Sequence, residues 1–194
     1  MQIEASIQCQ AALDAKDARG NVVGSTVLVH GAVHSWCEKG DAAMAASDIA
    51  LEQRFVERLS SETKHFRFFC VFKELSRDEA RRLCDVDGRS SMAMVATIGA
   101  PDLERAVGVA RYAPDADPLR REMAVTVADD WQHTRLAHEL LTHLVKWAKR
   151  QGVRQLYALE LTENHAMHAI ARDFGMKSTL DANDATQVVY SLAI

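Results

Sequence analysis

The sequence of 194 residues has few of the features that mark nucleic-acid-binding or membrane proteins. It contains 23 Lys and Arg against 27 Asp and Glu, which gives a formal net charge of -4, and no run of five like charges. A nucleic-acid surface normally requires a concentrated basic face, so we expect no nucleic-acid partner. The longest apolar run, Val22–Val33, is too short and too polar to span a bilayer, so we expect no membrane partner.

Cysteines are also few, and no CxxC pair occurs. They are Cys9, Cys37, Cys70 and Cys84. The first twenty residues lack the basic start and the apolar run of a signal peptide, so we predict a cytoplasmic protein with reduced thiols. His30, His34 and Cys37 have a spacing that zinc could use, but no fourth ligand lies in reach by sequence. We therefore interpret them as packing or surface residues and predict no metal.

Length and composition fit one globular domain, with 48% hydrophobic and 26% charged residues. Residues 1–21 are mixed in character and are predicted to form an N-terminal extension, with a helical stretch around Ala11–Ala18. Residues 22–194 are predicted to form a single domain.

Periodicity and capping signals predict an α/β order of elements. A first strand over Val22–Val33 is followed by a helix that Ser47 caps and that runs to about Ser60. Ser76 and Glu79 have the capping-box spacing and begin another helix. Three consecutive strands should then form an antiparallel meander, the first two joined by the turn Gly99–Asp102, because their connections are short. The strands are 91–98, 105–112 and 121–128.

The second half alternates helices and strands. A strong amphipathic helix is predicted over Thr134–Gln151, ended by Gly152. A strand over residues 153–161 and a helix from Asn164 to Gly175 follow, and residues 186–194 form the last strand.

This order and four local motifs resemble the GNAT family of N-acetyltransferases. The motifs are LEQRFVERLSSETKHFRFF, SMAMVATI with VGVARY, REMAVTVADDWQ, and ENHAMHAIARDFGM. Within the family, the similarity is strongest to the acetyltransferase domain of bacterial protein-lysine acetyltransferases, and it covers residues 47–192. It implies a mixed central sheet flanked by helices, in which the meander is followed by a parallel pair of splayed strands.

The resemblance implies that acetyl-CoA binds between the two splayed strands, 121–128 and 153–161. The pantetheine arm would pair with the main chain near Val125 and Val127. The pyrophosphate motif of the family aligns on Gln132, His133, Thr134, Arg135, Leu136 and Ala137. Free N–H groups and the helix dipole attract phosphate at such a helix start. Asn164 would lie near the pantetheine or the thiol. It could equally be a helix N-cap, and both roles can hold together.

The resemblance also implies that Glu122 is the general base, which accepts a proton from the attacking amine. The alternative is that Glu122 is a solvated charge paired with Arg120 or Arg121. Many relatives have a tyrosine acid where this chain has Ala171, so no proton donor to the departing thiolate is evident.

Arg135 replaces the glycine of the pyrophosphate motif, and three roles are open for it. It could pair with Asp129 or Asp130, it could bind the pyrophosphate through a bidentate guanidinium, or its side chain could fill the site and exclude CoA.

The function implied is transfer of an acetyl group from acetyl-CoA to a primary amine by direct attack in a ternary complex. The acceptor could be a protein lysine or a small amine. The alternatives are a catalytically weak acyl-CoA-binding regulatory module on the same fold and a purely structural or dimerising domain. An exposed final strand would also allow two chains to pair into a homodimer.

Overall fold

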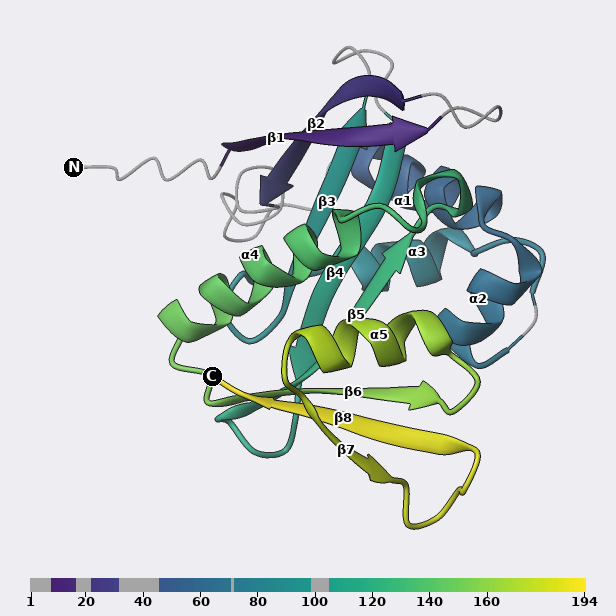
Figure 1. The fold of residues 1–194 in the computed structure, drawn as a ribbon. Coiled ribbons are helices and arrows are strands. Elements are labelled where there is room, and N and C mark those ends of the chain that lie inside the picture. Colours follow the sequence, from purple (N-terminus) through teal and green to yellow (C-terminus); the bar gives the residue numbers. More distant parts are fainter. Residues whose placement is uncertain (1–7, 17–21, 32–45, 71, 99–104) are drawn as a thin grey trace.

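The computed structural model describes residues 8–16, 22–31, 46–70, 72–98 and 105–194. They form one eight-stranded sheet with helices on both faces (Figure 1). The elements are β1 (Gln8–Lys16), β2 (Val22–Gly31), α1 (Ala46–Arg58), α2 (Ser61–Phe68), α3 (Arg77–Cys84), β3 (Met92–Ile98), β4 (Arg105–Pro114), β5 (Arg120–Val127), the 3-10 turn η2 (Asp129–Trp131), α4 (Leu136–Arg150), β6 (Gln155–Leu161), α5 (His165–Asp173), β7 (Lys177–Leu180) and β8 (Gln187–Ala193).

The sheet has the strand order β1-β2-β3-β4-β5-β6-β8-β7. Strands β1 to β5 pair antiparallel in sequence order, β5 and β6 pair in parallel, and β8 lies antiparallel between β6 and β7. The predicted fold class is therefore confirmed: an antiparallel meander precedes a parallel pair in a mixed sheet flanked by helices.

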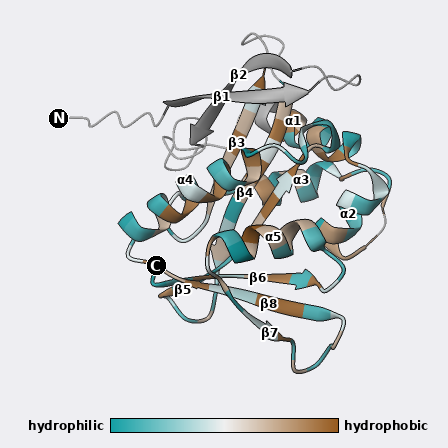
Figure 2. Ribbon diagram, in the orientation of Figure 1, coloured by the Kyte–Doolittle hydropathy of each residue, from teal (hydrophilic) through white to brown (hydrophobic). Residues whose placement is uncertain are grey.

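Helix α4 covers one face of the meander. Its buried residues repeat at helical spacing and form the apolar stripe predicted from the sequence: Leu136, Leu140, Leu141, Leu144 and Ala148. Gly108 of β4 lets the helix approach closely, because a Cβ there would lie 2.8 Å from Cδ1 of Leu140. Hydrophobic residues gather on the central strands, and hydrophilic residues lie on the outer side of the helices (Figure 2).

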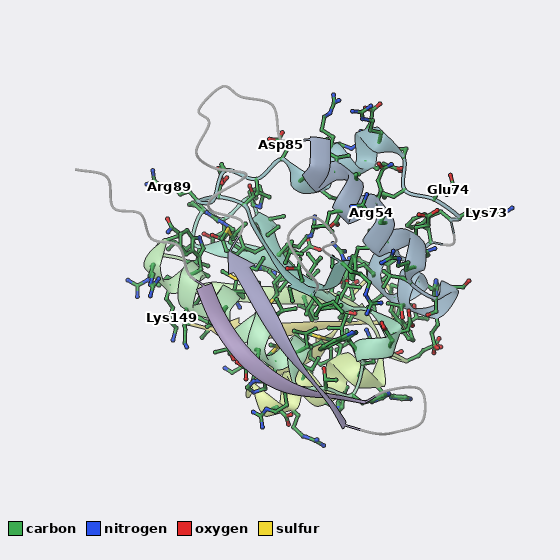
Figure 3. The ribbon with its side chains drawn as sticks, turned by 90° about the horizontal axis from the view of Figure 1, so that it is seen from above. Arg54, Lys73, Glu74, Asp85, Arg89 and Lys149 are labelled. Carbon is green, nitrogen blue, oxygen red and sulfur yellow. The ribbon has the colours of Figure 1, made fainter. Side chains whose placement is uncertain are left out.

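Helices α1, α2 and α3 form the layer on the opposite face. The buried carboxylate of Glu52 in α1 accepts a 2.8 Å bond from Arg111 of β4, which ties this layer to the sheet. The predicted capping box begins α3, with Ser76 and Glu79 bonding each other's backbone N–H groups. Lys73 and Glu74 lie at the outer edge of the layer and point to solvent (Figure 3).

Several predicted elements differ from the structure. The helix expected around Ala11–Ala18 is wrong: residues 8–16 form β1, whose pairing with β2 overrides the local helix preference. Helix α2 was not predicted: the sequence indicated one helix that ended near Ser60 and another that began after Ser76, with no helix between them. The predicted turn at Gly99–Asp102 lies outside the described residues. The separation of an extension at residue 21 from the domain stays a prediction.

Helix boundaries also shift. Helix α1 begins at Ala46, before the predicted cap Ser47, and α4 begins at Leu136 rather than Thr134, because η2 and a short loop precede it. The final strand β8 is not an edge, since β7 covers its outer side. The predicted exposure of the final strand is therefore wrong, and a homodimer stays a prediction.

Candidate active site

Strands β5 and β6 separate after three paired residues. They pair only at Arg120–Gln155, Arg121–Leu156 and Glu122–Tyr157. Beyond these pairs, residues 123–127 of β5 pair only with β4, and residues 158–161 of β6 pair only with β8. We call the region between these two unpaired strand edges the splay. Its facing main-chain groups are available to an extended ligand.

One face of the splay points to the helices α1 to α3. Paired residues of neighbouring strands point to the same side of a sheet. Arg111 pairs with Ala124 and contacts Glu52 of α1, so Ala124 and Glu122 also lie on this face. We call it the α1 face.

The other face points to α4 and α5. Val127 pairs with Gly108, which lies against Leu140 of α4. Because side chains alternate along a strand, Val125 lies on this face as well. We call it the α4 face. The two valines predicted to flank pantetheine and the predicted base are thus on opposite faces of β5.

The Glu122 side chain is exposed at the point where the two strands separate. Neither neighbouring arginine pairs with it, so the predicted pairing is wrong, whereas the solvent exposure in that alternative is confirmed. The Arg120 guanidinium lies 4.0 Å from the ring centroid of Tyr157, and Nη1 of Arg121 donates to the Pro118 carbonyl at 2.9 Å. Within the described ranges, Glu122 makes no hydrogen bond or ion pair through its side chain, so its carboxylate is available to a ligand.

Arg67 of α2 lies close to the splay. Burial lowers its pKa to about 10, and the positive charge of Arg111 adds to this effect, while Glu52, Glu160 and Glu122 oppose it. Arg67 is therefore near carboxylates on both sides of the splay. Among the residues that the structure describes, it makes no ion pair or hydrogen bond with any of them.

The predicted pyrophosphate loop lies between η2 and α4. His133 adopts a left-handed φ of 60°, and the Thr134 hydroxyl donates to the Trp131 carbonyl at 2.7 Å and accepts from the Leu136 N–H at 3.2 Å. Five other main-chain N–H groups at this helix start have no hydrogen-bond partner in the described part of the chain: His133, Thr134, Arg135, Ala137 and His138. Such a set of free donors is a natural anion site.

Arg135 is exposed at the N-cap of α4 and has an ordinary φ of -80°, which needs no glycine. Neither predicted acidic partner binds it. Asp130 pairs with Arg105 at 2.7 Å, and Asp129 accepts a 2.7 Å bond from the Ser60 hydroxyl. The predicted pairing of Arg135 with Asp129 or Asp130 is therefore absent among the described residues, and contact with the pyrophosphate and obstruction of it both stay predictions.

Asp129 instead connects the loop to α2. Its carboxylate accepts bonds from the Ser60 N–H at 2.8 Å, the Ser60 hydroxyl and the Thr63 hydroxyl at 2.8 Å. Partial burial acts to raise the pKa of Asp129, but these hydrogen bonds outweigh it and lower the pKa. The amide of Gln132 donates to the Thr63 hydroxyl at 3.1 Å, so Asp129 of η2 and Gln132 of the loop both hold the start of α2.

Replacing Asp129 by alanine is expected to lower the free energy of unfolding by about 1–2 kcal/mol, because several hydrogen bonds to a charged group are lost. Asp130→Ala is the matched control, since it breaks only an exposed ion pair worth less than about 1 kcal/mol. Urea unfolding of both variants measures the difference. Equal losses in the two variants would contradict the connecting role of Asp129.

Asn164 caps α5, as one predicted role requires. Its side-chain oxygen accepts from the Met167 N–H at 3.1 Å. The side-chain amide donates to Oε2 of Glu160 at 2.9 Å. The cap therefore also fixes a carboxyl group on β6.

Glu160 is 8% exposed and lies on β6 beyond its last pairing with β5. Desolvation raises its pKa to about 7, against the effects of the Asn164 bond and the Arg67 charge. The buried Tyr190 of β8 lies near it: desolvation raises the pKa of Tyr190, and the charge of Glu160 raises it further. The Tyr190 hydroxyl lies 3.1 Å from Nδ1 of His168 on the exposed side of α5.

The raised pKa of Glu160 predicts that ionising it destabilises the fold. Between about pH 4.5 and pH 7 the unfolded chain releases this proton while the folded chain retains it, so stability falls as the pH rises through that window. The total is on the order of 3–4 kcal/mol at 1.4 kcal/mol per pKa unit. Glu160→Gln should therefore gain stability over wild type at pH 8 relative to pH 4.5, as measured by urea unfolding. A gain that is the same at both pH values, or one shared by the exposed Glu163→Gln control, would contradict this prediction.

The acetyltransferase (GNAT) family model matches residues 53–176, which include α2, the splay, the loop and α5. The chain belongs to the GNAT family. It is 39% identical over 143 residues to Acetyltransferase PA5475 of Pseudomonas aeruginosa, an alignment that covers 74% of this chain and 77% of that protein. The predicted family is confirmed.

Solved structures support the same GNAT fold. The GNAT domain of S. lividans PAT superposes with a TM-score of 0.78 at 22% identity, covering both chains completely. The ribosomal-protein-S5-alanine acetyltransferase of Vibrio fischeri superposes with a TM-score of 0.64 at 10% identity, over 86% of this chain and 92% of that one. At these identities the similarity concerns the fold alone.

Ala171 of α5, at the position of the tyrosine acid in many relatives, is buried and carries no titratable group. Among the described residues, no group of metal-ligating side chains occurs and no helix could cross a membrane. The three residues whose spacing could suit zinc cannot be compared with this result, because His34, Cys37 and the side chain of His30 lie outside the described residues. Glu160 was not predicted as a site residue, although it occupies a buried position in the alternating pattern of β6, which is unusual for a carboxylate.

Proposed function

We propose that this protein transfers the acetyl group of acetyl-CoA to a primary amine, on a protein lysine or a small molecule, in a cytoplasmic setting. The observation that carries the proposal is the set of free N–H groups at the start of α4, which lies directly beyond the splayed end of β5. Pyrophosphate would bind these donors, including those of His133, Thr134, Arg135 and Ala137. Gln132 and Leu136 would shape the same loop.

Pantetheine would then extend along the unpaired edge of β5 near Val125 and Val127, as an added strand does. The acetyl thioester would reach the narrow end of the splay, where Glu122 lies. The exposed carboxylate of Glu122 would accept the proton of the amine as nitrogen attacks the carbonyl carbon. Asn164, which follows β6 on the other side of the splay, would lie near the pantetheine or the thiol.

An assay by mass spectrometry tests the function. The protein is incubated with acetyl-CoA and a panel of lysine peptides and small amines. At least one of these acceptors is expected to gain one acetyl group, while CoA is released in an equal amount. Release of CoA without an acetylated product would contradict the transferase.

Arg135 favours a second candidate, an acyl-CoA-binding module with little or no turnover, because it is exposed at the loop where the family motif has glycine. Binding of acetyl-CoA without transfer to any acceptor in the panel would support this candidate.

A further inference from the structure

The departing thiolate takes up a proton. Many GNAT relatives carry a tyrosine at the position of Ala171, whose buried methyl group cannot donate one. A side chain that donates this proton would therefore have to come from another element. The donor should lie on the α4 face of the splay, where Val125 and Val127 would flank the cofactor, and not on the α1 face with Glu122.

Glu160 lies on that face. Tyr157 pairs with Glu122 and so points to the α1 face. Alternation along β6 then places Ala158 and Glu160 on the α4 face, as confirmed by the bond of their neighbour Tyr190 to His168 of α5.

Glu160 also lies at the right depth along the splay. It is three residues beyond Tyr157 on β6, and Val125 is three residues beyond Glu122 on β5. The two residues would face each other if the strands stayed paired. A thioester that runs along β5 past Val125 would therefore pass between that strand and Glu160.

We propose that Glu160 is the catalytic acid of this site and donates a proton to the sulfur of CoA as the thioester breaks. The proposal rests on the proposed acetyltransferase function. As the amine nitrogen forms its bond to the carbonyl carbon, Glu122 takes the amine proton. As the carbon–sulfur bond breaks, its electron pair stays on sulfur, which takes the proton of the Glu160 carboxyl group. Both side chains exchange protons with solvent after the products leave.

The surroundings of Glu160 favour the protonated form of its carboxyl group up to about neutral pH. Three groups act on it from three elements: Asn164 of α5 donates a hydrogen bond to it, and Tyr190 of β8 and Arg67 of α2 lie near enough to interact electrostatically. His168 of α5 contacts Tyr190 and not Glu160 within the described residues. Desolvation by these elements exceeds the stabilisation that Asn164 and Arg67 give the anion, so the pKa is raised to about 7. Two carboxyl groups in unlike environments, one exposed and one buried, suit opposite proton-transfer roles.

Glu160→Gln tests the proposal because glutamine keeps the volume and can still accept the Asn164 bond. A thiolate is a good leaving group, so the loss in kcat is expected to be about tenfold at pH 6, below the usual range for acid catalysis. The ratio of wild-type to variant kcat should fall from about ten at pH 6 towards one at pH 9, because wild-type Glu160 loses its proton over this range. Taking the ratio removes the ionisation of the acceptor, which both proteins share.

A ratio that stays constant from pH 6 to pH 9 would overturn the proposal, since a merely structural change does not titrate. Affinity for acetyl-CoA should change less than about threefold, and Glu163→Gln, an exposed carboxylate three residues away, should behave as wild type. If Glu160→Gln does not fold, the wild-type profile with an acceptor whose amine stays neutral across this range decides. A fall in kcat of about tenfold supports the proposal, and a flat profile overturns it. Absence of any wild-type turnover would instead contradict the acetyltransferase function itself.

Discussion

Glu122→Gln is expected to lower kcat by about 10²–10⁴-fold and to leave the affinity for acetyl-CoA nearly unchanged. The glutamine amide matches the size of the carboxylate but cannot accept the amine proton. Glu122 is exposed at the narrow end of the splay, and neither Arg120 nor Arg121 holds it. The substitution therefore breaks no ion pair within the described residues, and the fold should keep its stability.

The assay should follow acetylated product by mass, because four native cysteines would disturb a thiol-colour readout. Glu74→Gln is the control, since it removes an exposed carboxylate at the outer edge of the helical layer (Figure 3). Equal turnover in wild type and Glu122→Gln would reject Glu122 as the base. A loss of acetyl-CoA affinity as large as the loss in kcat would assign it to binding.

Arg135→Gly is expected to weaken acetyl-CoA binding by about 1.5–3 kcal/mol, the range for a hydrogen bond to a charged group. The reason is that the exposed guanidinium at the start of α4 has no partner among the described residues, while both nearby carboxylates bind other groups. A cation in the first helical turn is disfavoured by the helix dipole unless an anion is close. The CoA pyrophosphate would supply that anion, and the wild-type affinity should then depend more strongly on salt than that of the variant.

Two further variants separate charge from shape at Arg135. Arg135→Ala should weaken binding as much as Arg135→Gly, because a φ of -80° suits either residue. Lys149→Ala removes a positive charge from the other end of α4 and should change the affinity little (Figure 3). A tenfold or larger gain in affinity on Arg135→Gly would mean that the side chain blocks the site.

The parts of the fold that follow from local signals could be predicted from the sequence. The capping box of Ser76 and Glu79, the alternation in β3 to β5 and the apolar stripe of α4 each depend on neighbouring residues. Strand β1 could not be predicted in this way, because its strand conformation depends on pairing with β2.

The candidate site divides in the same manner. The loop of residues 132–137 and the cap Asn164 were predicted from motifs. The role of Asp129 was not, because its partners Ser60 and Thr63 lie far away in the sequence. The burial of Glu160 depends on α2, α5 and β8 together, so only the alternating pattern of β6 gave a local sign of it.

Calorimetric titration with acetyl-CoA tests the central claim, that this GNAT chain binds an acyl-CoA in the splay of β5 and β6. We expect one binding site per chain with micromolar affinity, about 8 kcal/mol, together with a raised melting temperature. Glu122→Gln should bind equally well, and Arg135→Gly less tightly. No heat and no shift in melting temperature at millimolar acetyl-CoA would contradict both the transferase and the binding-module functions.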